Sequence, residues 1–256
     1  MKTNLLFFLF LIFLITGTGC RNKGTHKTEN QGQSDTSTVA DTGFTGIKKY
    51  YSRNLLVKEV TFKNGIRQGL MKTYYQNGKL YQTFWYENGI REDTARWYFE
   101  DGKVFRETQY KSDSMEGSQI QYYRNGKVRA RLSYVRGMRT PFLEEFTSDG
   151  KKVSGYPEMV INTKDEYNRN GTYKVYLVLS KKDVKVNFYR GEYINGLFIP
   201  KKYIKLNTND FTGYLELKKT GIPGNSSVGI IAEISTGLGN KYLTYKKIDL
   251  PYNDLK

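Results

Sequence analysis

The chain is poor in the two side chains that most often build catalytic and metal sites. Its 256 residues include one cysteine, Cys20, and one histidine, His26. One cysteine excludes an intrachain disulfide, and the shortage of both residues excludes a His/Cys zinc cluster. Because His26 lies ahead of the segments that predict strands, no Ser-His-Asp or Cys-His arrangement can form within the predicted folded part. We therefore expect no enzyme activity, no cofactor and no metal.

Long apolar runs are also lacking. The longest, residues 5–15, has 11 residues and follows Lys2. It is too short to span a bilayer as a helix but is typical of a signal peptide, which we place at residues 1–19. The sequence Thr-Gly-Thr-Gly that precedes Cys20 resembles the cleavage box of bacterial lipoproteins. The alternative is a plain signal peptide or anchor with a chance cysteine.

The resemblance to lipoproteins implies an address and one partner. Cys20 would become the lipid-bearing N-terminus, and membrane lipid would hold the chain through several acyl groups (palmitate among them). The implied location is the bacterial cell envelope, with the outer membrane favoured over the inner. Residues 20–43 are rich in Asn, Gln, Ser, Thr and Gly and predict a disordered tether.

Acidic residues are outnumbered, with 25 Asp and Glu against 41 Lys and Arg, so the formal net charge is +16. The basic residues are spread along the chain, and a solvated basic surface is the simplest interpretation. Attraction to an anionic surface such as lipid headgroups is the alternative. Because the N-terminus predicts export, nucleic acid is not expected as a partner.

Glycine, in contrast, recurs at a fixed interval of 24 residues, and a constant interval predicts a repeat architecture. Each of these glycines ends an Asn-Gly or Asp-Gly pair, the sequence that favours type I′ hairpin turns with positive φ at both central residues. A second set of turn signals lies between them, so each copy predicts two short antiparallel strands. The structural turn residues are Asn54, Gly65, Gly78, Gly89, Gly102, Gly126, Gly137 and Gly150.

Apolar and polar residues alternate along the predicted strands. Phe62 repeats as an aromatic residue in the following copies and Val60 repeats as Phe84, Thr108 and Leu132, whereas the position of Glu59 stays polar. This alternation predicts an antiparallel sheet with one buried and one solvated face. Tyr74, Tyr98 and Tyr122 share a further column. We expect either a ladder of cross-strand aromatic residues or a platform that binds a ligand such as a glycan.

The block Tyr-Tyr-x-Asn-Gly-Lys-Leu, followed by an aromatic residue, Asn-Gly and often a third glycine, resembles the bacterial variant of the MORN repeat. The resemblance covers residues 44–155. Gly69 and Gly117 are third glycines, whereas Asp93 and Pro141 replace them in two copies. A worn copy at Phe146 is expected to cap the array. Similar bacterial repeats imply, as one alternative, an antitoxin-like regulatory protein.

Residues 156–256 lose the 24-residue interval and predict a second all-β domain. About seven short alternating runs separated by turn signals favour a β-sandwich of immunoglobulin-like size, and a β-barrel stays open. No Cys–Trp–Cys pattern is present. The runs are residues 158–163, 172–180, 184–190, 203–206, 211–219, 228–235 and 241–248.

Together these features favour a non-enzymatic, membrane-anchored lipoprotein with a binding or scaffolding role at the cell envelope. An envelope protein or a glycan is the expected partner. A second alternative is a carboxylate-dependent hydrolase with its site in the C-terminal domain. The adjacent pairs Glu92-Asp93 and Glu144-Glu145 are carboxylate candidates, but both lie at or near predicted turns or strand edges, where a solvated charge is the simpler interpretation.

Overall fold

The computed structural model describes residues 43–224 and 226–256. The predicted signal peptide, Cys20 and almost all of the predicted tether lie outside these residues. The described residues are nearly all-β, with 62% strand and 3% helix, which confirms the predicted fold class.

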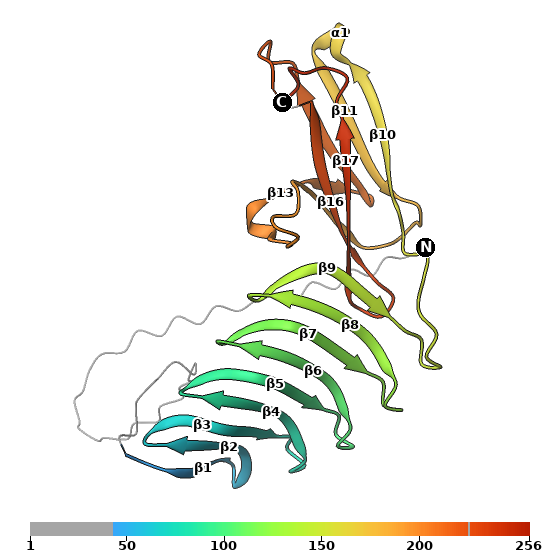
Figure 1. Cartoon of the computed structure of the whole chain (residues 1–256). Helices are drawn as coiled ribbons and strands as arrows, with labels where there is room; N and C mark the ends of the chain where they lie inside the picture. The colour runs from blue at the N-terminus through green and yellow to red at the C-terminus, as the bar shows by residue number, and fades with distance from the viewer. Residues whose placement is uncertain (1–42, 225) are drawn as a thin grey trace, which may run out of the picture. The chain divides into compact units, whose positions relative to one another are not determined.

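The first part of the described chain is a nine-stranded antiparallel sheet in which each strand pairs with the next along the sequence (Figure 1). Such a meander follows from hairpin turns at regular intervals. The strands are β1 (Gly46–Ser52), β2 (Leu55–Lys63), β3 (Ile66–Tyr74), β4 (Leu80–Glu87), β5 (Ile90–Tyr98), β6 (Val104–Lys111), β7 (Ser114–Tyr122), β8 (Val128–Val135) and β9 (Met138–Glu145).

Two kinds of connection alternate in this sheet. The first is a two-residue turn with positive φ at both residues, as type I′ turns require. These turns are Asn64-Gly65, Asn88-Gly89, Ser112-Asp113 and Arg136-Gly137, and they form what we call the turn edge of the sheet. Arg53-Asn54 is a turn of the same kind at the opposite edge. Asn54 therefore shares the positive φ of the glycines with which it aligns. It lies in a two-residue turn, however, whereas those glycines lie in longer loops.

The second connection is a five-residue loop, found at residues 75–79, 99–103 and 123–127. These loops form the loop edge. In residues 75–79 the N–H of Tyr75 donates to the carbonyl of Lys79 at 2.8 Å, and the N–H of Gly78 donates to the carbonyl of Tyr75 at 3.0 Å. Only the glycine of each loop has positive φ. The prediction of a type I′ turn at these glycines is wrong, although their need for a left-handed backbone is real.

The strands bend because each copy carries β-bulges (Figure 1). One interrupts the pairing of β2 with β3 between Val60 and Phe62, and its counterparts recur in later copies. Gly69 and Gly117, both with positive φ, lie within these bulges, on the strand that carries the extra residues. Asp93, which replaces a third glycine, keeps this conformation with φ of 60°. The replacement therefore preserves the bend at some cost in backbone strain.

One face of the sheet is buried, and we call it the apolar face. Val60, Met71 and Tyr86 form a hydrophobic cluster on it, and Ala95 and Trp97 continue it along the sheet. The predicted alternation is confirmed for Val60 and its column, but the polar column on the opposite face contains a buried exception, described below.

Successive copies are joined by backbone hydrogen bonds along the turn edge. The N–H of Gly89 donates to the carbonyl of Arg67 at 2.8 Å, and the N–H of Asp113 donates to the carbonyl of Arg91 at 3.0 Å. The same bond recurs from Gly65 to Phe44 and from Gly137 to Met115. Each turn thus uses the preceding copy to satisfy a donor that its own hairpin leaves free.

Side chains of the preceding copy satisfy the other turn donor. The N–H of Asn88 donates to Gln68 Oε1 at 2.9 Å, that of Ser112 to Glu92 Oε1 at 2.8 Å, and that of Arg136 to Glu116 Oε2 at 2.7 Å. Thr45 does the same for Asn64. These acceptors stand just before the third-glycine position of the sequence pattern.

The array ends where the C-terminal part supplies the next partner. The carbonyl of Arg139 holds the place that those of Arg67 and Arg91 hold in earlier copies, and it accepts from the N–H of Phe198 at 2.9 Å. The worn copy contributes only the loop at residues 147–151 and a bridge between Phe146 and Lys152.

A buried carboxylate joins β9 to the C-terminal part. Glu145 is 1% exposed. Its Oε1 accepts from Thr236 Oγ1 and Asn240 Nδ2, both at 2.7 Å, and its Oε2 accepts from the hydroxyl of Tyr156 at 3.1 Å. Asn240 Oδ1 in turn accepts from Gln121 Nε2 at 2.9 Å, so the hydrogen-bond network around Glu145 extends to β7.

The C-terminal part consists of two four-stranded sheets, ordered β10-β11-β15-β14 and β13-β12-β16-β17. Each of the seven runs expected from the sequence contains a strand, so the predicted β-sandwich is confirmed in its layers. The strands are β10 (Met159–Glu166), β11 (Thr172–Leu179), β12 (Val186–Arg190), β13 (Ile204–Lys205), β14 (Asn207–Asn209), β15 (Thr212–Lys218), β16 (Ser227–Ser235) and β17 (Lys241–Asp249). Three short elements were not expected: the helix α1 (Tyr167–Asn170), the 3-10 turn η1 (Pro200–Lys202) and the strand β14.

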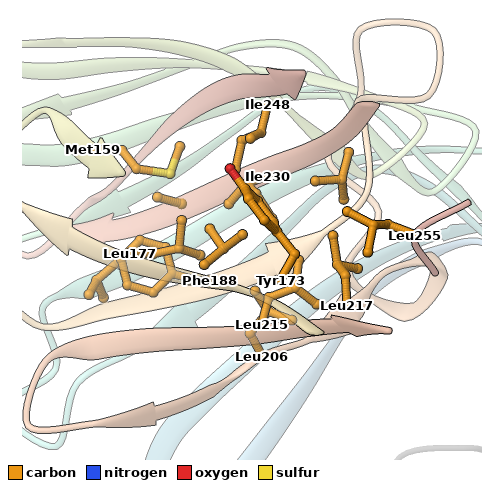
Figure 2. Close-up of a cluster of buried hydrophobic side chains, with 14 of the residues drawn as sticks. Met159, Tyr173, Leu177, Phe188, Leu206, Leu215, Leu217, Ile230, Ile248 and Leu255 are labelled. Carbon is orange, nitrogen blue, oxygen red and sulfur yellow. The ribbon is translucent and has the colours of Figure 1, made fainter. Parts of the chain in front are cut away.

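Both sheets contribute to one hydrophobic core (Figure 2). Leu177 and Leu217 reach it from one sheet, and Phe188 and Ile230 reach it from the other, all fully buried. Gly213 lies against Phe188 so closely that a Cβ at this glycine would come within 2.5 Å of the ring. A well-packed core of this kind is what a chain without disulfides needs.

The ladder glycines can be tested at Gly102, whose φ is 87° and whose Cβ position is open space. Gly102→Val should lower the free energy of unfolding by about 1–2 kcal/mol through backbone strain alone. Gly237→Val is the matched control, because Gly237 also faces open space but lacks positive φ. Urea unfolding of both variants measures this, and equal midpoints for the two would contradict a role for the left-handed backbone.

The loop edge offers a second test. The hydroxyls of Tyr75 and Tyr123 donate to the carbonyls of Tyr98 and Phe146 in the next copy, at 2.6 and 2.7 Å. Phe99, at the equivalent place, has no hydroxyl. Tyr75→Phe should therefore lose about 1 kcal/mol of stability, whereas Phe99→Tyr should gain a similar amount by reaching the carbonyl of Tyr122.

Thermal and urea unfolding of these two variants and of the double variant provide the measurement. If Phe99→Tyr leaves the unfolding midpoint unchanged while Tyr75→Phe lowers it, the copies are not equivalent at this bond.

Candidate functional site

A row of alternating charges crosses the face opposite the apolar one, and we call this side the charged face. Residues directly opposite one another on neighbouring strands make up the row. Opposite charges in such positions attract, although each exposed pair contributes little. The row consists of Lys49, Glu59, Lys72, Thr83, Arg96, Glu107, Ile120, Arg131 and Glu144.

Ion pairs join four of the eight neighbouring pairs in this row. Arg96 Nε lies 2.8 Å from Glu107 Oε1, and Glu59 lies 3.6 Å from Lys49 and 3.9 Å from Lys72. Thr83 interrupts the row and is only 7% exposed, so the expectation that its whole column is solvated is wrong at this position. A short side chain between two long cations is covered by their stems.

The predicted tyrosine column lies beside this row. The hydroxyl of Tyr74 donates to Glu59 Oε2 at 2.6 Å, and that of Tyr122 donates to Glu107 Oε2 at 2.8 Å. Tyr98 makes no such bond to a residue that the structure describes, because Thr83 stands where the other copies have glutamate. The three rings are half-buried.

Burial and these hydrogen bonds alter the acidity of the pairs. Burial together with the bond to Glu59 raises the pKa of Tyr74 to about 12, and burial with the bond to Glu107 raises that of Tyr122 to about 12. The bond from Tyr74 holds the pKa of Glu59 below its usual range. At neutral pH the hydroxyls of Tyr74 and Tyr122 are therefore donors, and Glu59 is an ionised acceptor. This arrangement fixes side chains on the surface and is not suited to proton transfer.

The rings of the tyrosine column do not stack on one another, and other large apolar side chains are exposed on the array. Tyr74, Tyr98 and Tyr122 lie on alternate strands, so their rings are on the order of 10 Å apart, beyond direct ring contact. Leu70, Trp85 and Phe142 are exposed by 37%, 39% and 47% elsewhere on the array. Half-exposed rings among carboxylates and cations can bind a polar partner through both stacking and hydrogen bonds.

The remaining predicted site residues are placed as follows. Cys20 lies outside the described residues. Gly65, Gly89 and Gly137 line the turn edge, and Gly78, Gly102 and Gly126 line the loop edge, with Asn54 in the turn that follows β1 and Gly150 in the worn copy. None of these turn residues lies in the tyrosine column, so the structure does not bring the two sets together into one site.

The carboxylate pairs serve contacts that hold the fold. Glu92 binds a turn N–H, Glu144 lies 2.7 Å from Lys152 Nζ, and Glu145 is buried among neutral donors. In the C-terminal part, the carboxylate of Glu166 forms ion pairs with three cations, Lys164, Arg169 and Lys174. Hydrogen bonds from Lys174 and Lys164 lower the pKa of Glu166 to about 2, which keeps it ionised and unsuited to act as a general acid.

Residues 43–224 and 226–256 contain neither a candidate metal site nor a candidate membrane-spanning helix. No group of three or more His, Cys, Asp or Glu side chains in this range is arranged to hold a metal ion. No helix in the same range is both long and apolar enough to cross a bilayer.

The hairpin array, its turn interval and its third-glycine positions agree with a known repeat. The MORN repeat variant matches residues 67–84, 94–112 and 115–136. The matched segments lie within the nine-stranded sheet and run from β3 to the turn after β8. MORN repeats suggest a binding or scaffolding role and are in general non-enzymatic. A comparison with curated proteins finds no match to this chain.

Residues that join the MORN copies were missed from the sequence. Gln68, Glu92 and Glu116 repeat every 24 residues just before the third-glycine position, and their shared task is to accept a turn N–H. The interval itself was the available signal. The role of this column was missed because Gln and Glu are common on solvated surfaces, and the sequence does not show that these side chains accept a turn N–H.

The tyrosine–glutamate pairs generate a test with an internal control. Tyr122→Phe removes the bond to Glu107 and should lower the free energy of unfolding by about 1 kcal/mol. Tyr98→Phe removes a hydroxyl that has no described partner and should change it by much less. Urea unfolding compares the two, and an equal loss for Tyr98→Phe would show that the glutamate bond is not the source of the effect.

Proposed function

We propose that this protein is an exported, lipid-anchored component of a bacterial cell envelope, where it binds or scaffolds other molecules without catalysing a reaction. The observation that carries the proposal is the MORN repeat array, whose charged face presents half-exposed tyrosines in a regular column. A repeat surface of this kind offers a partner several equivalent contacts in one direction.

The anchor half of the proposal is supported by the N-terminal sequence. Residues 1–19 have the pattern of a signal peptide, and Cys20 follows small residues as in lipoprotein cleavage boxes. Several acyl chains on Cys20 would hold the protein stably, since one chain binds only marginally. Residues 21–43 would then act as a tether with a coil span of roughly 25 Å.

The binding half is supported by the chemistry of the charged face. Alternating charges favour a polar partner that carries both signs or many hydroxyls, and the rings beside them add stacking area. An envelope protein or a glycan fits this description. The raised pKa values of Tyr74 and Tyr122 keep these two hydroxyls protonated, so both act as hydrogen-bond donors around neutral pH.

The anchor is tested by labelling cells with palmitate. Wild-type protein should be labelled and recovered with the membrane fraction, whereas Cys20→Ser should lose the label because the acylated thiol is gone. His26→Ala is the control and should keep both label and location. Unlabelled wild-type protein, free in the periplasm or the medium, would overturn the proposal.

The same cells test the binding role. Crosslinking of wild-type protein should recover a partner that depends on the anchor and is lost or reduced in Cys20→Ser. Recovery of the same partner at equal yield from the unanchored variant would contradict an envelope-surface role while leaving binding itself intact.

A further inference from the structure

A pocket of about 460 Å³ lies at the loop edge of the array, beside the turn between β16 and β17. Three arginines contribute to its walls, and no aspartate or glutamate does. Its lining residues are Phe99, Phe105, Arg106, Gln121, Tyr122, Tyr123, Arg124, Arg129, Leu238, Gly239 and Asn240. We call this the arginine pocket. Its volume suits a small organic molecule.

Aromatic rings hold the three guanidinium groups in place. Arg106 lies over the ring of Trp97 at 3.9 Å, Arg124 over Phe99 at 4.6 Å, and Arg129 over Tyr123 at 6.0 Å. A guanidinium that rests on a ring keeps its N–H edge free for other partners. The rings therefore orient the donors without using them.

The guanidinium of Arg106 has N–H donors without a hydrogen-bond partner among the described residues. Among the described residues it makes no hydrogen bond or ion pair, and its Nε is buried without a partner. Arg124 is 3.3 Å from Asp101, and Arg129 donates to the carbonyl of Leu238 and lies 3.5 Å from Gln121 Oε1. A buried N–H donor without a partner is costly, and an anion in the pocket would offset that cost.

Each of the three arginines occurs only once in its column of the repeat, so the packing of one copy against the next does not require it. The position of Arg106 is Lys58, Gln82 and Ala130 in other copies. The position of Arg124 is Gln76, Glu100 and Ser148, and that of Arg129 is Val57, Tyr81, Phe105 and Val153. Stacking does not require arginine at any of these columns, yet three converge on one pocket.

We propose that the arginine pocket binds a phosphate monoester. Three cations around one cavity favour a doubly charged group, and planar guanidinium edges match phosphate oxygens in pairs. Asn240 and Gln121, which are hydrogen-bonded to each other, complete the polar wall of the pocket. This inference gives the proposed binding role a ligand class and rests on that role, but it does not depend on the lipid anchor.

Calorimetric titration of the purified full-length chain in a nonionic detergent tests the proposal. Glucose 6-phosphate should bind, and glucose should not. Arg106→Gln should weaken binding of glucose 6-phosphate by about tenfold to a hundredfold, as expected for loss of a charge-assisted hydrogen-bond pair. Arg67→Gln is the matched control, because Arg67 also lies over a ring, that of Tyr86 at 5.5 Å, but is outside the pocket.

Soluble dihexanoyl phosphatidic acid, titrated in parallel, distinguishes the source of the phosphate. Tighter binding of glucose 6-phosphate indicates a soluble ligand, and tighter binding of the short-chain lipid indicates a headgroup; either supports the pocket when it depends on Arg106. Circular dichroism verifies that each variant is folded, and Arg124→Gln replaces Arg106→Gln if the latter does not fold.

Three results would overturn the proposal: no binding of either phosphate ester, equal affinity in Arg106→Gln, or an equal loss in Arg67→Gln, which would show attraction by net charge alone. Because binding is measured on purified protein, its outcome is independent of palmitate labelling. The failure of the pocket and the failure of the envelope anchor can therefore be told apart.

Discussion

The array depends on one constraint: a type I′ turn leaves two backbone N–H donors that its own hairpin cannot satisfy. Each turn meets this need with a carbonyl and a side-chain oxygen of the preceding copy, as Gly89 and Asn88 do with Arg67 and Gln68. The acceptors must recur at the same interval as the donors. The 24-residue interval of the sequence is the consequence, and a copy of a different length would break the bonds on both sides.

The same constraint explains how the array ends. The last copy has an acceptor, the carbonyl of Arg139, but no following turn, and Phe198 of the C-terminal part supplies the missing donor. Glu145 strengthens this junction with bonds from Thr236, Asn240 and Tyr156. The β-sandwich is therefore more than a neighbour in sequence, because it provides the cap that a repeat array needs at its open edge.

Positions that carry no stacking bond are free to vary, and both candidate surfaces lie there. On the charged face, Thr83 replaces the glutamate of other copies and leaves Tyr98 without the bond that Tyr74 makes. At the loop edge, three arginines that each occur once in their columns line the pocket around Arg106. In a repeat protein, departures from the column are where function can be added without loss of the fold.

The sequence by itself determined the all-β class, the hairpin interval and the strands of the sandwich, because turn chemistry and alternation act over a few neighbouring residues. It did not reveal the bulges that bend the strands or the buried state of Thr83, since these depend on what lies across the sheet. The task of Gln68 and the burial of Glu145 belong to the same group. Only the tertiary structure decided which polar residues meet, because hydrogen bonds between copies join residues about 20 positions apart.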